Sequence, residues 1–94
     1  MDFEFIKKEK NEIEFVVTKE DSSFFDLVIN IASQKREVEF ASLKREDNLE
    51  DKFYVYLKTK DTPAKDTLLT CINEAEENLK NIISNLEKTL PNSK

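Results

Sequence analysis

Histidine and glycine are both missing from the 94-residue sequence, and cysteine occurs once, as Cys71. Without histidine, the chain lacks the commonest metal ligand and the usual general base, so Ser-His-Asp and Cys-His catalytic arrangements are impossible. Without glycine or a pair of cysteines, it has no glycine-rich phosphate loop and no thiolate zinc site. A lone cysteine in a helical pattern is expected to be a buried apolar residue. We therefore predict that the chain has no catalytic residue, cofactor or metal of its own.

Long hydrophobic runs and basic charge are also scarce. No apolar stretch approaches the roughly 20 residues that span a bilayer, and residues 1–4 lack the basic start and apolar core of a signal peptide. The net charge is −5, whereas affinity for nucleic acid comes mainly from Lys and Arg side chains that neutralise phosphates. We expect a cytoplasmic protein that binds neither a membrane nor, directly, nucleic acid.

Apolar and polar residues alternate in four short segments of the sequence, residues 3–7, 13–18, 37–41 and 53–58. An alternation with a period of two residues predicts β-strands that have one apolar face. Polar residues 10–12 and 45–48 separate the members of each pair, so the sequence predicts two hairpins. Because the chain has no glycine, we expect any turn position with a positive φ to be Asn or Asp.

Two helices are predicted, one between the hairpins and one after the second hairpin. Residues 21–23 (DSS) supply acceptors for the free amides of a helix start, and Asp26 favours the positive end of the helix dipole. These signals predict a helix over residues 24–34. Thr62 as the cap and Pro63 as the first helical residue predict a second helix, which ends near Leu90.

The predicted order β-β-α-β-β-α defines a single-domain α+β fold. We expect a four-stranded antiparallel sheet with both helices on its apolar face and a long C-terminal helix. The opposite face of the sheet is expected to be charged and to carry Glu4, Glu14, Glu37 and Glu39. One domain over residues 1–90, followed by a frayed tail of residues 91–94, completes this prediction.

The first predicted helix is apolar around more than half of its circumference. At about 100° per residue, its apolar side chains cover an arc of roughly 200°, which is wider than one sheet can bury. The candidate partner contacts on this arc are Phe24, Phe25, Leu27, Val28, Ile29 and Ile31. Two interpretations stay open: the sheet and second helix of the same chain bury this arc, or one edge of it contacts a partner chain.

The second predicted helix carries one apolar stripe along its length, at alternating spacings of four and three residues. About 27 residues at 1.5 Å each give a rod of roughly 40 Å, whereas a six-residue strand reaches only about 20 Å. The helix is therefore expected to overhang its own sheet. An apolar overhang in water favours coverage by another chain, with coverage by the first helix as the alternative. The predicted partner contacts at this end are Leu79, Ile82, Ile83 and Leu86.

Three stretches of the chain resemble the archaeal DNA-directed RNA polymerase subunit L family, in the order and at the spacing that the family shows. They are residues 7–14 (KKEKNEIE), 38–41 (VEFA) and 56–60 (YLKTK). Related domains are the eukaryotic small assembly subunit and the dimerisation domain of the bacterial alpha subunit. The family's usual run DHTLGNL at the first helix is replaced here by DSSFFDL, which retains Asp21 and Leu27.

The resemblance implies a non-catalytic assembly subunit that acts in transcription. It implies a heterodimer with the D subunit of RNA polymerase, which forms the platform for the large catalytic subunits of a nucleotidyltransferase complex. The alternative from another class is a homodimeric regulatory or small-molecule-binding domain, because a fold alone does not determine function. A small enzyme is a third possibility, and it would require a pocket with carboxylates of perturbed pKa.

Overall fold

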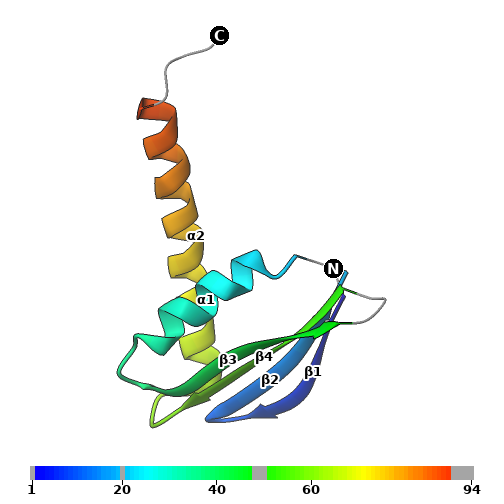
Figure 1. Cartoon of the computed structure of the whole chain (residues 1–94). Helices are drawn as coiled ribbons and strands as arrows, with labels where there is room; N and C mark the ends of the chain where they lie inside the picture. Colours follow the sequence, from blue (N-terminus) through cyan, green and yellow to red (C-terminus); the bar gives the residue numbers. More distant parts are fainter. Residues whose placement is uncertain (1, 20, 48–50, 90–94) are drawn as a thin grey trace.

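The computed structural model describes residues 2–19, 21–47 and 51–89. The elements follow in the order β1 (Asp2–Glu9), β2 (Glu12–Thr18), α1 (Ser23–Ser33), β3 (Val38–Asp47), β4 (Asp51–Thr59) and α2 (Ala64–Thr89). The four strands form one antiparallel sheet with the spatial order β1-β2-β4-β3, and both helices lie on the same face of it (Figure 1). The predicted fold is therefore confirmed. The predicted helix end at Leu90 and the predicted tail of residues 91–94 lie outside the described residues.

The two central strands supply most of the floor of the hydrophobic core. On β2 and β4, alternate side chains point towards the helices and are at most 2% exposed; these are Ile13, Phe15, Val17, Phe53, Val55 and Leu57. The register pairs Phe15 with Val55 across the two strands. Side chains between these positions, such as Glu14 and Tyr56, lie on the opposite face. The alternation seen in the sequence is thus the alternation between the core and the outer face.

The edge strand β3 departs from the predicted alternation near its start. Its register with β4 shifts between Val38 and Phe40, and such an irregularity changes which face the following side chains occupy. Phe40 therefore lies exposed on the outer face, with its ring centroid 5.7 Å from that of Tyr56. Ala41 and Leu43 pack against the core instead. The prediction that placed Phe40 on the apolar face with Val38 is wrong for this reason.

The start of α1 is fixed by polar contacts that the sequence partly predicts. The backbone N–H of Ser23 donates to Asp21 Oδ1 at 2.7 Å, and the helix begins at Ser23, one residue before the predicted start. Arg45 on β3 holds Asp26 through a 2.5 Å contact between Nη2 and Oδ2. A different expectation fails: in the described residues, the non-glycine residue with a positive φ is Lys19, at 62°, and not an Asn or Asp.

The β1–β2 turn anchors the start of α2. The side-chain amide of Asn11 donates to Thr59 Oγ1 and to the carbonyl of Thr62, both at 3.2 Å. The Asn11 carbonyl accepts the N–H of Thr59 at 2.9 Å, and the carbonyl of Lys10 accepts the N–H of Ala64 at 2.7 Å. The sequence predicted that the helix begins at Pro63; it begins one residue later, at Ala64. These bonds fix the position from which α2 leaves the sheet.

Replacing Asn11 by Ala should lower the free energy of unfolding by about 1–2 kcal/mol, because two hydrogen bonds are lost, one of them part-buried. Urea denaturation followed by circular dichroism measures the change. The control is Asn73→Ala, since Asn73 is exposed on α2 and should not destabilise the chain when replaced. Equal losses for the two variants would show that the turn does not anchor the helix.

Candidate interaction surface

Helix α2 consists of a covered half and an uncovered half. In its first three turns Ala64, Thr67, Leu68, Cys71 and Ala75 are buried. From residue 76 to residue 89 every position is exposed. Figure 1 shows this second half rising away from the sheet and beyond α1. At 1.5 Å per residue the 26-residue helix is about 39 Å long, whereas the strands of 7 to 10 residues beneath it reach about 23–33 Å, so the predicted overhang is confirmed.

The apolar stripe of α2 does not end where its coverage ends. Leu68, Ile72 and Ala75 begin a run at spacings of four and three residues, and the same run continues through Leu79, Ile82 and Leu86, with Ile83 beside it. These last four side chains are between 40% and 55% exposed. We call them the α2 stripe. A helix that keeps its core-facing pattern after leaving its core presents a surface suited to another protein.

Two contacts set the direction of the projecting helix. The bonds at the β1–β2 turn hold its first residue, and an ion pair joins Glu74 in its middle to Lys35 in the connection between α1 and β3. In that pair, Lys35 Nζ lies 2.7 Å from Glu74 Oε2. The hydrogen bond to Glu74 is the largest of the causes that raise the pKa of Lys35. The α2 stripe therefore extends from a fixed base.

The predicted contact residues on α1 lie closer to the chain's own core than those on α2. Val28 is 0% exposed, so the prediction that it contacts a partner is wrong: it faces inward from the centre of the helix. The Phe25 ring packs 5.7 Å from the rings of both Phe15 and Phe53, measured between centroids. The half-buried residues that pack against the core are Phe24, Phe25, Leu27, Ile29 and Ile31.

The exposure of the α2 stripe limits its contribution to the stability of the isolated chain. If Leu79 and Ile82 were buried, replacing either by Ala would cost about 2–5 kcal/mol. Both side chains are at least 40% exposed, so the folded chain alone does not depend on them to that degree. The apolar run along α2 is continuous in sequence, but only its first part, Leu68, Ile72 and Ala75, belongs to or packs against the core of the domain.

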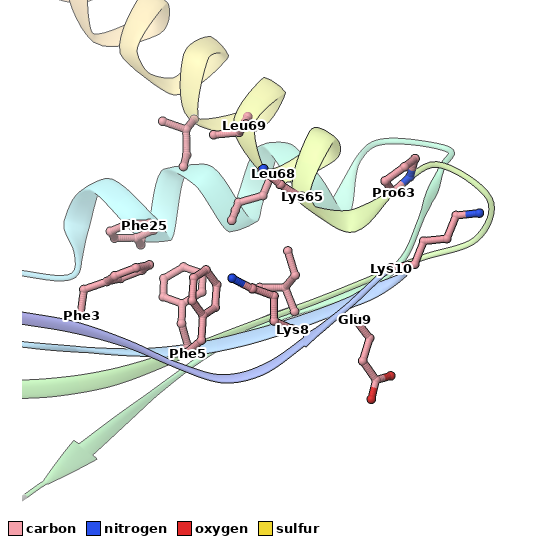
Figure 2. Close-up of a pocket in the computed structure, with 13 residues that line it drawn as sticks. Phe3, Phe5, Lys8, Glu9, Lys10, Phe25, Pro63, Lys65, Leu68 and Leu69 are labelled. Carbon is pink, nitrogen blue, oxygen red and sulfur yellow. The ribbon is translucent and has the colours of Figure 1, made fainter.

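Sequence reasoning did not find a second surface feature, an apolar groove between β1 and the start of α2. The cavity measures about 600 Å³, and Figure 2 shows side chains from both elements around it. Its apolar lining includes Phe3, Phe5, Phe15, Phe25, Leu68 and Leu69. The alternation of Phe3 and Phe5 was a signal for their shared face. The coverage of that face depends on where α2 crosses the sheet, which no local pattern specifies.

Cys71 lies buried in the covered half of α2. Burial is the largest cause that raises the pKa of its thiol, which favours the neutral form. Among the described residues, no group of three or more His, Cys, Asp or Glu side chains is placed to hold a metal ion. None of the helices formed by the described residues is long and apolar enough to cross a membrane.

On the outer face of the sheet, Tyr56 and Glu12 form a hydrogen-bonded pair. The Tyr56 hydroxyl donates a hydrogen bond to Glu12 Oε2, and Lys7 Nζ lies 3.3 Å from Glu12 Oε1. The bond from Tyr56 is the largest of the causes that lower the pKa of Glu12. The same bond is the largest cause that raises the pKa of Tyr56 to about 12.

The raised pKa of Tyr56 predicts a pH effect. Its contribution to stability is present below the pKa of a free tyrosine, about 10, and is lost as the pH rises through about 12. In a Tyr54→Phe background, Glu12→Gln should move the ionisation of Tyr56 to lower pH, as followed by the ultraviolet absorbance of the phenolate. Glu4→Gln on the edge strand should leave the midpoint in place. The same midpoint in both variants would contradict the assignment.

An α+β domain whose apolar helix stripe extends beyond its own core has the form of a protein-interaction module. The chain belongs to the RNA polymerase Rpb3/Rpb11 dimerisation domain family, whose model matches residues 12–89. DNA-directed RNA polymerase subunit L from Thermoplasma acidophilum has a similar structure, with a TM-score of 0.77 and 15% sequence identity. The match covers 93% of this chain and 86% of that chain. No curated protein matches the chain. The family resemblance seen in the sequence is thereby confirmed.

Proposed function

We propose that the chain is a non-catalytic assembly subunit of a DNA-directed RNA polymerase, acting through a heterodimer with the polymerase's D subunit. The observation that carries the proposal is the exposed α2 stripe in a domain whose family dimerises polymerase subunits. Residues 1–90 are the proposed dimerisation domain. Nucleotide polymerisation then belongs to the large subunits in the cytoplasm. This chain contributes no catalytic residue, metal or cofactor and no direct contact with nucleic acid or membrane.

The energetics of the α2 stripe support a partner. Removing an apolar side chain fully from water contributes about 1.5–3 kcal/mol, so covering four half-exposed side chains contributes roughly 1 kcal/mol each. The opposite side of the same turns carries Glu77, Lys80 and Ser84, which are exposed and hydrated. A helix with one apolar side and one hydrated side is suited to contact a single partner chain along its apolar side. The outer edges of Leu27, Ile31 and Phe24 on α1 are candidate contacts at the base of the same interface.

Co-expression with the D subunit of the same organism's polymerase tests the proposal. We expect an equimolar complex that survives affinity and size-exclusion chromatography, with the chain recovered in proportion to the tagged D subunit. An unrelated tagged protein of similar size serves as the control. Separate elution of the two chains under these conditions would contradict the heterodimer. Family membership favours this proposal over a regulatory or small-molecule-binding domain.

A further inference from the structure

The groove between β1 and the start of α2 has an aromatic end and a basic end. Figure 2 shows the rings of Phe3, Phe5 and Phe25 together at one end and Lys10 at the other. Phe3 lies near the start of β1 and Lys8 near its end, so at about 3.3 Å per residue they are roughly 16 Å apart along the strand. A molecule that fills the groove therefore meets two different chemical environments.

The aromatic end is formed by four rings that pack together. The centroid of the buried Phe15 ring lies 5.1 Å from that of Phe3, 6.0 Å from that of Phe5 and 5.7 Å from that of Phe25. Phe3 is 53% exposed and Phe5 is 40% exposed, and Leu69 is half exposed in the same lining. An alkyl chain that lay on these side chains would remove apolar surface from water on both sides of the contact.

The remainder of the lining is basic. Lys8, Lys10 and Lys65 line the groove together with one acidic residue, Glu9, and Figure 2 shows the Glu9 side chain directed to the opposite side of the sheet from α2. None of the ion pairs among the described residues involves these three lysines. Lys8 Nζ lies 4.8 Å from the centroid of the Phe5 ring, so its charge stands over the apolar floor. An anionic group beside Lys8 would therefore gain an ion-pair partner without displacing one.

The dimensions of the groove fit a small molecule. Its volume is about 600 Å³, within the roughly 300–1,000 Å³ of small-molecule sites. An added β-strand is disfavoured, because the register of the edge strand β1 with β2 shifts between Phe5 and Lys7 and interrupts the ladder at this edge. None of the four residues of the α2 stripe lines the groove, so the groove is separate from the proposed heterodimer contact on that stripe.

We propose that this groove binds an anionic amphiphile, a carboxylate with one unbranched alkyl chain such as a fatty acid anion. The alkyl chain lies on Phe3, Phe5 and Leu69, and the carboxylate lies between the ammonium groups of Lys8 and Lys65. The tail points toward the start of β1, because that end of the groove is aromatic. Burial of the tail provides most of the affinity, since exposed ion pairs contribute little. The lysines select the sign of the charge on the head group.

Isothermal titration calorimetry of the full-length chain with decanoate, below the concentration at which decanoate forms micelles, tests this proposal. One decanoate should bind per chain. Each methylene removed from the tail should weaken binding by about fourfold, so octanoate should bind about fifteenfold less tightly. Decyltrimethylammonium has the same alkyl tail and the opposite charge, and it should bind about tenfold less tightly than decanoate.

Replacing Lys8 and Lys65 together by Glu should reverse this preference, so that the cationic amphiphile binds more tightly than decanoate. The matched control replaces Lys44 and Lys60 by Glu, which changes the net charge equally at exposed positions outside the groove lining and should keep the preference for decanoate. Replacing Leu69 by Ser should weaken the binding of both amphiphiles by about tenfold, because the tail loses an apolar contact. Leu69 is half exposed, so circular dichroism should report an unchanged fold.

The absence of saturable decanoate binding overturns the proposal, as does equal affinity for octanoate and decanoate. Equal effects of the Lys8/Lys65 and Lys44/Lys60 replacements also overturn it, because net charge alone would then explain the selectivity. Binding to vesicles of anionic phosphatidylglycerol without binding of monomeric decanoate overturns it as well, because the surface would then recognise a membrane. The same chain is mixed with the polymerase's D subunit. A chain that binds this subunit but not decanoate refutes only the amphiphile site, whereas one that binds decanoate but not the subunit refutes only the heterodimer.

Discussion

Replacing Ile82 by Asp should abolish binding to the polymerase's D subunit and leave the chain folded. Ile82 is 53% exposed in the projecting half of α2, so the new carboxylate stays hydrated in the isolated chain. In a dry interface the same carboxylate is unpaired, at a cost of several kcal/mol. Each 1.4 kcal/mol is tenfold in affinity, so we expect binding to weaken by about a hundredfold or more. Circular dichroism reports folding, and isothermal titration with the partner reports binding.

The matched control for this experiment is Ser84→Asp. Ser84 lies on the opposite side of the same helix and is exposed, so the same new charge stands away from the α2 stripe. This variant should bind as the wild type does. If Ile82→Asp and Ser84→Asp bind equally well, the stripe is not the interface. If Ile82→Asp unfolds the isolated chain, the second half of α2 belongs to the core after all.

Replacing Val28 by Asp should unfold the isolated chain. Val28 is 0% exposed at the centre of α1 and lies within the core cluster. A carboxylate at this position loses its hydration and gains no described cationic partner, at a cost of several kcal/mol. Small domains have about 5–15 kcal/mol of total stability, so most of it would be lost. Far-ultraviolet circular dichroism and thermal melting measure the effect.

Asn30→Asp on the same helix controls for the new charge. Asn30 is exposed, and the replacement keeps the size of the side chain, so the melting curve should stay close to that of the wild type. A Val28→Asp variant that melts like the wild type would show that α1 does not pack on the sheet as described. Val28→Asp and Ile82→Asp together distinguish a residue needed for folding from a residue needed for assembly.

The features that could be predicted from the sequence are those that a local period determines. Phe53, Val55 and Leu57 alternate with polar or amphipathic residues, and this period of two predicts the common face on which all three are buried. The overhang of α2 followed from its length alone. A helix of 26 residues is about 39 Å long, which exceeds the roughly 23–33 Å reached by strands of 7 to 10 residues.

The features that could not be predicted depend on contacts between elements. Phe40 turned outward because of a register shift in the β3–β4 ladder, which leaves no mark in the alternation of apolar residues. The groove depends on the order of the strands and on the anchoring of Ala64 by Lys10, so neither Phe3 nor Leu69 could be placed there in advance. For α1, the wide apolar arc indicated burial on several sides. The arc did not show that its centre, Val28, faces the chain's own core.

The central claim, that the chain joins a polymerase through the α2 stripe, is tested most directly by co-purification from the source organism. The tagged wild-type chain and its Ile82→Asp variant are expressed there at equal levels, and the proteins recovered with each are identified by mass spectrometry. The large polymerase subunits should be recovered with the wild-type chain and lost with the variant. Their reproducible absence from the wild-type sample, or their undiminished recovery with Ile82→Asp, would contradict the claim.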